Sequence, residues 1–247
     1  RLQGDWSSDV CSSDLLQGYR IYTPDTHTLR GLVSDPQQQE PLGLSGGRLA
    51  DAVQATLDAL GDAAEGAREA VSDLLDWVDS FDVAPATAVP MSRAVPTTQF
   101  VLRFRDRFMR EERNRVSGYD ASEGVLLVLF LMVLGLHPKA PAVFAVDNVD
   151  HGLNPRLARR LMAIFTEWVL SRDDRQVFFT AHNPLVLDGL RLTDDRVRLF
   201  TVDRSLPSGH TRYHRVEVTP ELLARSKEGW TLSRMWVNGL LGGVPDV

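Results

Sequence analysis

The sequence is poor in cysteine and lysine and has no long apolar run. Its 247 residues include one cysteine, Cys11, which excludes a disulfide within the chain and fits a reducing cytoplasm. The longest apolar run, residues 125–136, is too short to cross a bilayer and predicts a buried helix. Hydrophobic residues make up 43% of the chain and charged residues 24%, which is typical of a globular protein. We therefore expect a cytoplasmic protein that makes no use of a membrane.

The first fifteen residues do not read as authentic protein. Residues 5–15 (DWSSDVCSSDL) resemble the translation of a common sequencing-library adapter, and Cys11 lies inside them. We therefore expect residues 1–15 to be an artefact and the authentic reading frame to begin upstream. The formal charge changes from −6 (27 basic, 33 acidic residues) to −4 (26 basic, 30 acidic) without them, and neither value attracts nucleic acid as a whole.

The remaining chain predicts alternating strands and helices. Residues 142–146 and 176–180 are short apolar runs typical of buried strands, and residues 155–170 between them predict a helix that begins at a proline. Strand–helix–strand connections of this length indicate a parallel sheet. The other expected elements are helices over 49–60, 63–78, 120–136, 184–190 and most of 222–241, strands over 99–105, 197–202 and 213–218, a strand–turn–strand over 19–33, and connecting loops over 34–47 and 83–96.

Asp147 follows directly after the strand predicted over residues 142–146. Doubly wound α/β proteins present a carboxylate to a bound ligand in this way. Asn148, Asp150 and a Gly-Leu-Asn-Pro turn come next. Two further polar segments, 120–124 (DASEG) before the apolar helix and 180–184 (TAHNP) after the next strand, are expected to gather at the same sheet edge.

Taken alone, each of these side chains also has a structural explanation. Ser122 suits a helix cap, Asp147 suits a cap of the following turn, and Asn148 is a good turn former. A loop histidine such as His182 is commonly satisfied by hydrogen bonds. The order of the segments and the elements that carry them favour a functional interpretation.

In these segments the sequence resembles the C-terminal half of an ABC-type ATPase, of the branch that contains RecF, SMC and the overcoming-lysogenisation-defect proteins. Such proteins are often described as AAA family ATPases. The resemblance implies a P-loop NTPase-like α/β fold with a mostly parallel sheet, flanking helices and a helical insertion. It divides the chain into the rest of an N-terminal lobe (16–98), the second half of the core (99–202) and a terminal strand and helix (203–247). It implies a subunit that binds and hydrolyses ATP, dimerises around Mg²⁺-ATP and drives an effector such as a nuclease.

The resemblance also implies a role for individual residues. Ser122 and Gly124 are similar to the signature motif, which grips the γ-phosphate bound by the other protomer at a helix start. Asp147 matches the Walker B aspartate, which holds Mg²⁺ through water. Asn154 lies in the segment that resembles the D-loop at the dimer seam. His182 matches the switch histidine that touches the γ-phosphate.

Two departures from the family pattern qualify this interpretation. The Gly-x-x-x-x-Gly-Lys-Ser/Thr motif is absent, and neither of the two lysines, Lys139 and Lys227, follows a glycine loop. We expect that motif to lie upstream of the adapter-like segment. In addition, Asn148 stands where the family carries its catalytic glutamate, and an amide cannot accept the proton of the attacking water. Asp150 is the candidate substitute.

Three functions therefore stay open. The first is a hydrolysing ATPase, and the second is a nucleotide-dependent switch or scaffold with weak or no hydrolysis because of Asn148. The third is a metal-dependent hydrolase built from Asp147, Asp150, His151 and His182. The signature-like helix has no role in the third, which is the least favoured.

An arginine-rich run, residues 103–115, admits two interpretations. Its six arginines could contact DNA phosphates. Because the run also contains Asp106, Glu111 and Glu112, a solvated surface whose charges pair with one another is the favoured interpretation.

Overall fold

The computed structural model describes residues 18–88, 99–205 and 207–243. The described residues form two compact units, the first within Arg1–Gly152 and Trp168–Thr180, and the second within Leu153–Glu167 and Ala181–Val247. In the described parts the elements are, in chain order, β1 (Arg20–Tyr22), α2 (Thr26–Leu29), α3 (Leu49–Leu60), η1 (Gly61–Ala63), α4 (Ala64–Leu74), β2 (Val78–Pro85), η2 (Ala86–Ala88), β3 (Phe100–Asp106), η3 (Glu111–Arg113), β4 (Arg115–Ser117), α5 (Glu123–Leu136), β5 (Val143–Val146), α6 (Pro155–Leu170), β6 (Gln176–Phe179), η4 (Pro184–Gly189), β7 (Phe200–Arg204), β8 (Thr211–Arg215), α7 (Pro220–Lys227) and α8 (Leu232–Val237).

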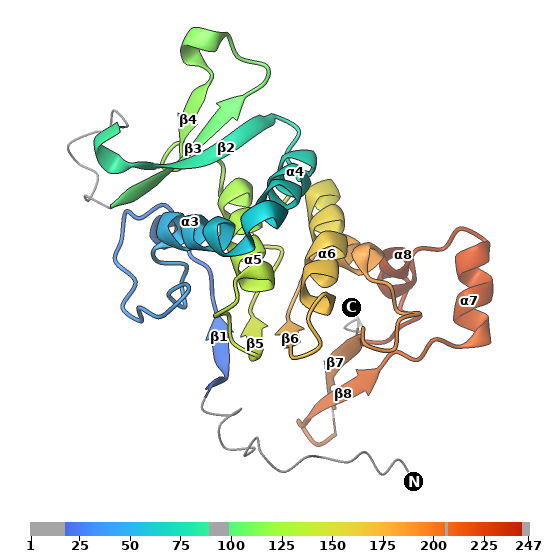
Figure 1. Cartoon of the computed structure of the whole chain (residues 1–247). Coiled ribbons are helices and arrows are strands. Elements are labelled where there is room, and N and C mark those ends of the chain that lie inside the picture. The colour runs from blue at the N-terminus through green and yellow to red at the C-terminus, as the bar shows by residue number, and fades with distance from the viewer. Residues whose placement is uncertain (1–17, 89–98, 206, 244–247) are drawn as a thin grey trace. The chain divides into compact units, whose positions relative to one another are not determined.

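A parallel sheet of order β1-β5-β6 organises the first unit (Figure 1). The parallel pairing predicted from the apolar runs is confirmed, and β5 is the central strand of these three. Tyr22 of β1 is fully buried and makes edge-to-face contacts with Phe130 of α5 and Phe144 of β5. Burial raises the pKa of the Tyr22 hydroxyl to about 12. These rings fasten α5 to the strands that carry the candidate site.

Helix α5 forms the core of the first unit because it is apolar on every side. Each residue from Gly124 to Gly135 is buried, as expected for a helix without a polar face. The expected helix over residues 120–136 is thus confirmed, with its first turn starting at Glu123. In the described part of the chain, no helix is long and apolar enough to cross a membrane.

An antiparallel sheet of order β2-β3-β4 is the second layer of this unit, with α3 and α4 nearby (Figure 1). Helix α3 matches its expected range, and strand β3 begins and ends one residue later than expected. The helix expected over residues 63–78 ends at Leu74, because Val78 is buried at the start of β2. The loop expected over residues 83–96 is wrong where β2 continues to Pro85, and residues 89–98 lie outside the described residues.

The second strand expected within residues 19–33 is also wrong. A short helix, α2, occupies that place because Asp25 caps it by accepting hydrogen bonds from the backbone N–H and the hydroxyl of Thr28. The loop expected over residues 34–47 has no helix or strand. Its shape depends on the buried Asp35, whose carboxylate accepts the N–H groups of Gln37, Ser45 and Gly47.

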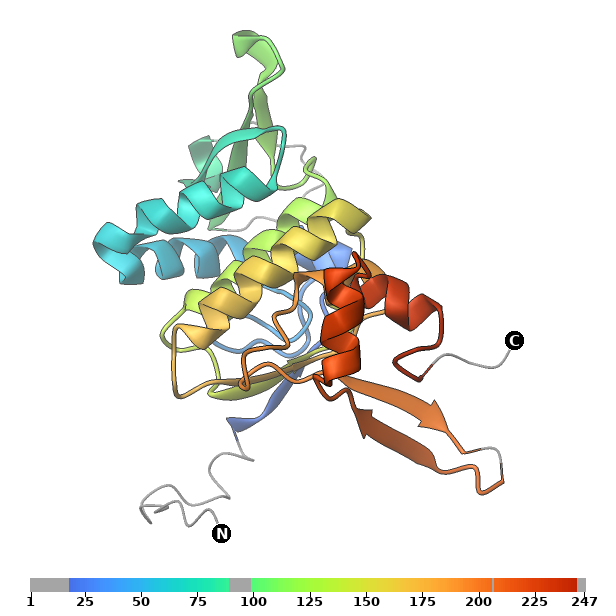
Figure 2. The same cartoon turned by 90° about the vertical axis from the view of Figure 1, so that its right-hand side faces the viewer.

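The second unit contains most of α6 together with η4, a ribbon of β7 and β8, and the terminal helices α7 and α8 (Figure 2). Helix α8 is held to η4 by Asp188, which accepts the backbone N–H of Ser233 at 2.9 Å and its hydroxyl at 2.7 Å. The expected strands 197–202 and 213–218 are each displaced toward the intervening turn. The two strands continue past the apolar residues on which the prediction rested. There Arg212 and Asp203 are register partners and form an ion pair of 2.8 Å.

Candidate functional site

Asp147 and Thr180 meet at the carboxyl ends of neighbouring parallel strands. The strand β5 ends at Val146 and β6 ends at Phe179, which are register partners, so the next residue of each strand emerges at one edge. The hydroxyl of Thr180 donates to Oδ1 of Asp147 and accepts the backbone N–H of Asn148 at 2.9 Å. The predicted carboxylate is therefore held at a sheet edge in a fixed orientation.

The turn after Asp147 is bent by two left-handed residues. Asn148 has φ 52° and Gly152 has φ 69°, a region that asparagine and glycine enter at least cost. The backbone N–H of Val149 donates to the carbonyl of Thr180 at 2.9 Å, which ties the turn to β6. Asn148 therefore does serve as a turn former, the structural role that its residue type suggested.

Glu123 joins this turn to the start of α5. Its Oε1 lies 3.3 Å from Nε2 of His151 and also accepts a hydrogen bond from the hydroxyl of Thr26. A Cβ placed on Gly152 would lie 2.7 Å from Cδ of Glu123 and 2.8 Å from its Oε2, so a side chain at that position would displace the carboxylate of Glu123. The signature-like helix start and the turn after Asp147 are thus in direct contact, as expected for segments that share a sheet edge.

Ser122 and Gly124 stand at the first residues of α5. Ser122 occupies the N-cap position with an extended backbone, and its side chain makes no capping hydrogen bond. Asp120 accepts a hydrogen bond from the hydroxyl of Ser117 at 2.7 Å. Ser122 therefore stands at the position expected of a cap, but its side chain does not cap the helix. The N–H groups of the first helical turn have no intrahelical acceptors and present a positive dipole end, which suits an anion.

Asn154 and His182 belong to the second unit. The side-chain oxygen of Asn154 accepts the backbone N–H of Leu157 at 2.9 Å, which caps α6. His182 is exposed and precedes Asn183, which caps η4 by accepting the N–H of Leu185 at 3.0 Å. The assignment of Asn154 and His182 to a nucleotide site stays a prediction.

Asp150 is half-buried within the turn, and His151 beside it is exposed. Among the residues that the structure describes, no group of three or more histidine, cysteine or acidic side chains could hold a metal ion. This finding gives no support to a metal-dependent hydrolase built from Asp147, Asp150, His151 and His182.

Sequence reasoning missed two contributors to this geometry. It assigned no role to Glu123 or to Thr26. A helix start with a carboxylate directly after the cap was the available signal for Glu123. Nothing in the local pattern marks Thr26, because its partner is 97 positions away in the chain.

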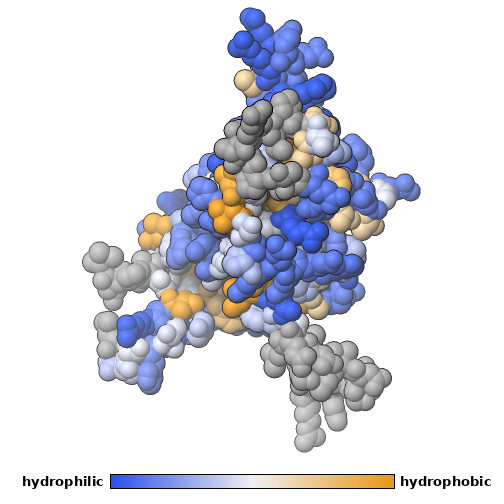
Figure 3. All heavy atoms as spheres, turned by 90° about the vertical axis from the view of Figure 1, so that its left-hand side faces the viewer, coloured by the Kyte–Doolittle hydropathy of each residue, from blue (hydrophilic) through white to orange (hydrophobic). Residues whose placement is uncertain are grey.

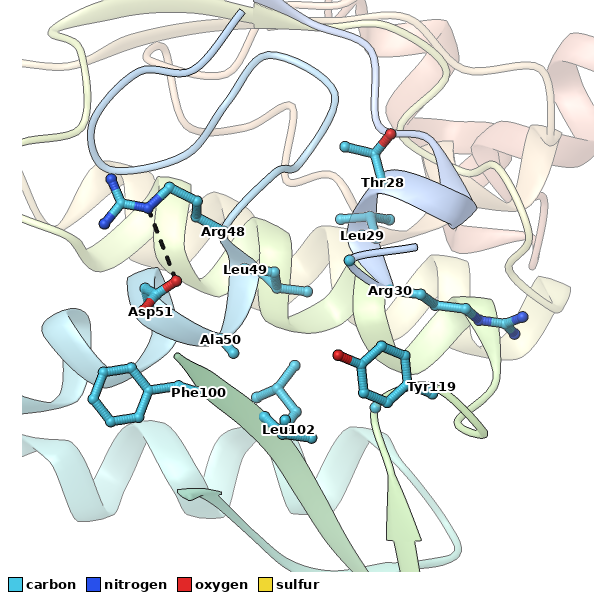
Figure 4. A pocket seen from close by; sticks show the side chains of 13 residues that line it. Thr28, Leu29, Arg30, Arg48, Leu49, Ala50, Asp51, Phe100, Leu102 and Tyr119 are labelled. Atoms are coloured by element: carbon cyan, nitrogen blue, oxygen red, sulfur yellow. Dashed lines mark ion pairs between the residues drawn. The ribbon is translucent and has the colours of Figure 1, made fainter. Parts of the chain in front are cut away.

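A small cavity lies elsewhere in the first unit, between the end of α2 and the starts of α3 and β3 (Figure 4). Its volume is about 50 Å³, and no residue predicted to bind nucleotide lines it. Arg48 and Asp51 form an ion pair of 3.8 Å at its rim, and burial raises the pKa of the Asp51 carboxyl. Pockets for drug-sized ligands occupy about 300 Å³ or more, so this cavity is too small for a nucleotide.

The chain matches one family model over residues 31–188, which is more than half of its length. That family is described as an AAA domain, putative AbiEii toxin, of type IV toxin–antitoxin systems. The matched region contains Ser122, Asp147 and His182. No protein with a curated description matches the sequence.

Several solved structures of SMC ATPase heads are similar to this structure. One, from work on ATP-driven dimerisation and DNA-stimulated activation of SMC ATPases, is 10% identical with a TM-score of 0.45 and covers 74% of this chain and 98% of its own. The SMC head domain of Thermotoga maritima is 16% identical with a TM-score of 0.40, covering 71% and 56%. The Smc head of Pyrococcus yayanosii, with a coiled coil and joint, is 11% identical with a TM-score of 0.43, covering 70% and 30%. At these values no residue role is transferred from them.

Proposed function

Because the chain belongs to this family of AAA domains, we propose that it forms the C-terminal half of an ATPase that binds Mg²⁺-ATP. The proposal rests on two sets of contacts, those that hold Asp147 to Thr180 and those that hold the turn after Asp147 to the start of α5. Together they combine a carboxylate, a hydroxyl and a helix N-terminus at the carboxyl edge of a parallel sheet. In open α/β sheets this edge is where ligands bind.

The oxygen ligands at this edge fit the way in which proteins usually bind Mg²⁺. Mg²⁺ is usually bound by one or two carboxylates together with waters and substrate phosphates, rather than by a cage of protein ligands. Asp147 supplies one carboxylate, and the hydroxyl of Thr180 orients it. When bound, the ion would neutralise charge on the phosphates, while Asp147 and Thr180 hold its water shell at the sheet edge.

The second protomer enters the proposal through Ser122, Gly124 and Asn154. The free N–H groups at the start of α5 would bind the γ-phosphate of ATP held by the partner, and Asn154 would lie at the seam between the two copies. His182 would touch the γ-phosphate of its own protomer. We propose a homodimer closed by two nucleotides, which drives an effector protein such as a nuclease.

Slow hydrolysis is the expected behaviour of this dimer. The amide of Asn148 cannot take a proton from water, and its left-handed backbone belongs to the turn. Asp150, two residues further on, is the nearest carboxylate in the sequence that could act as a base. A nucleotide-dependent switch without turnover is the second candidate, and Asn148 is the observation in its favour.

The test compares the complete reading frame with the 247-residue chain. We expect the complete protein to hydrolyse ATP and the 247-residue chain to release no phosphate, since it has no Gly-x-x-x-x-Gly-Lys-Ser/Thr loop. Asp147→Asn should abolish Mg²⁺-dependent turnover, and Asp150→Ala should lower it about 100-fold if Asp150 is the base. If Asp150→Ala leaves turnover unchanged, Asp150 is not the base. An intact gene without a glycine–lysine loop refutes the ATPase proposal.

A further inference from the structure

The arginine-rich run, residues 103–115, forms the hairpin of β3 and β4, and its charges do not pair with one another. Of its arginines, Arg103 makes an ion pair, at 2.6 Å, but its partner is Asp82 of β2, outside the run. Arg107 donates to a backbone carbonyl. Asp106 accepts backbone N–H groups of the turn. Within the described residues, the expectation of a self-paired surface is therefore wrong.

Arg105 and Arg115 lie directly opposite each other across the hairpin. They are register partners in the antiparallel ladder, and both are exposed. Opposed residues in such a ladder have Cα atoms about 5 Å apart, and like charges placed there destabilise the pairing. Neither guanidinium has a carboxylate partner in the described part of the chain. An anion placed between them would relieve this repulsion.

The tip of the hairpin exposes two large apolar side chains. Phe108 is 76% exposed and Met109 is 50% exposed. Oδ1 of Asp106 accepts their backbone N–H groups at 2.8 and 3.1 Å, which fixes the turn that presents them. The exposed Arg110 lies next to them. The hairpin extends beyond the helices of its unit (Figure 1), and its outer end is mainly hydrophilic (Figure 3).

From this arrangement we propose that the β3–β4 hairpin binds duplex DNA through its phosphate backbone. Arginines are common phosphate ligands, and the tip of the hairpin, residues 107–114, lies beyond the last register pairs of β3 with β2 and with β4. The run carries six arginines and three acids, a charge of +3 in a chain of −6, so it attracts a polyanion locally although the whole chain does not. Phe108 and Met109 would contact sugars and base edges. The proposal is independent of nucleotide binding.

The test measures the anisotropy of a fluorescein-labelled duplex of mixed sequence, with the 247-residue chain, from 50 to 200 mM NaCl. Arg105→Gln with Arg115→Gln should weaken binding about ten-fold or more at 100 mM and reduce the slope of log K against log salt by about 1.8. Phe108→Ala should weaken binding about five-fold and leave the slope unchanged. Glu111→Gln with Glu112→Gln should tighten binding, because it removes two negative charges beside the phosphates.

A matched control comes from the other exposed ribbon. Arg212 and Arg215 on β8 already have carboxylate partners, Asp203 at 2.8 Å and Glu217 at 3.4 Å, so replacing both with glutamine should change binding less than about two-fold. An equal loss in this control refutes the assignment, as does the absence of duplex binding at 50 mM NaCl. Tighter binding to poly-L-glutamate than to the duplex also refutes it and identifies an acidic protein as the partner.

Discussion

Gly152→Ala tests the contact between the turn after Asp147 and the start of α5. At φ 69° an alanine costs about 1–2 kcal/mol in backbone strain. Its Cβ would also lie 2.7–2.8 Å from the side chain of Glu123 and would force that carboxylate away from His151 and Thr26. The loss of one such hydrogen bond costs about 1 kcal/mol. We therefore expect the free energy of unfolding to fall by roughly 2–3 kcal/mol, measured by urea titration.

Two further variants separate strain from the contact. Gly239→Ala, at φ 75° with no atom within 4 Å of the added Cβ, carries the backbone strain alone and should cost about 1–2 kcal/mol. Gly152→Ala combined with Glu123→Ala should cost about 1 kcal/mol less than the sum of the single variants, because each single variant loses the contacts of the Glu123 carboxylate and the double variant loses them only once. If the two changes are additive, or if Gly152→Ala costs no more than Gly239→Ala, Glu123 does not occupy the position described.

The remaining predictions concern buried and half-buried polar groups of the first unit. Tyr22→Phe should raise the free energy of unfolding by about 1 kcal/mol, because the buried hydroxyl has no hydrogen-bond partner among the described residues. Arg175→Met should lower it by about 2–3 kcal/mol, since this guanidinium donates to the last carbonyls of α5, and burial lowers its pKa to about 10. Burial also lowers the pKa of His137 below 6.5, so the unfolded chain binds its proton more readily. The contribution of neutral His137 to the free energy of unfolding should be complete above pH 6.5 and should decline as the pH falls. Urea titrations of His137→Gln should lack this part of the decline.

The elements with strong apolar patterns were predictable from the sequence. Helix α5 and the strands β5 and β6 contain enough consecutive apolar residues for periodicity and length to define them. The beginning of β2 was not predictable, because Val78 continues the helical spacing of α4 and burial against the second sheet decides its conformation. Helix α2 was missed for the opposite reason, since a four-residue helix held by one Asp25 cap leaves almost no periodic signal.

The candidate site was predictable as a set of segments but not as a set of contacts. Asp147 follows a strand in the sequence, and its exposure at the sheet edge follows from parallel pairing. Its orientation depends on Thr180, and the position of the turn depends on Glu123 and Thr26. These partners lie 33 and 97 positions apart in the chain, and such pairings depend on the tertiary fold rather than on local spacing.

The left-handed backbone of Asn148 bears on whether a glutamate at this position could act as the catalytic base. A glutamate at this position would meet about 1–2 kcal/mol of strain at φ 52°, whereas asparagine enters this region readily. The present turn is therefore suited to an amide, and Asn148→Glu must change the backbone before it can place a carboxylate beside a water. If Asn148→Glu in the complete protein accelerates hydrolysis, the turn can adopt a right-handed form and the residue type alone limits turnover. If it only lowers stability, the backbone excludes a glutamate there, and a base must come from elsewhere, with Asp150 as the first candidate.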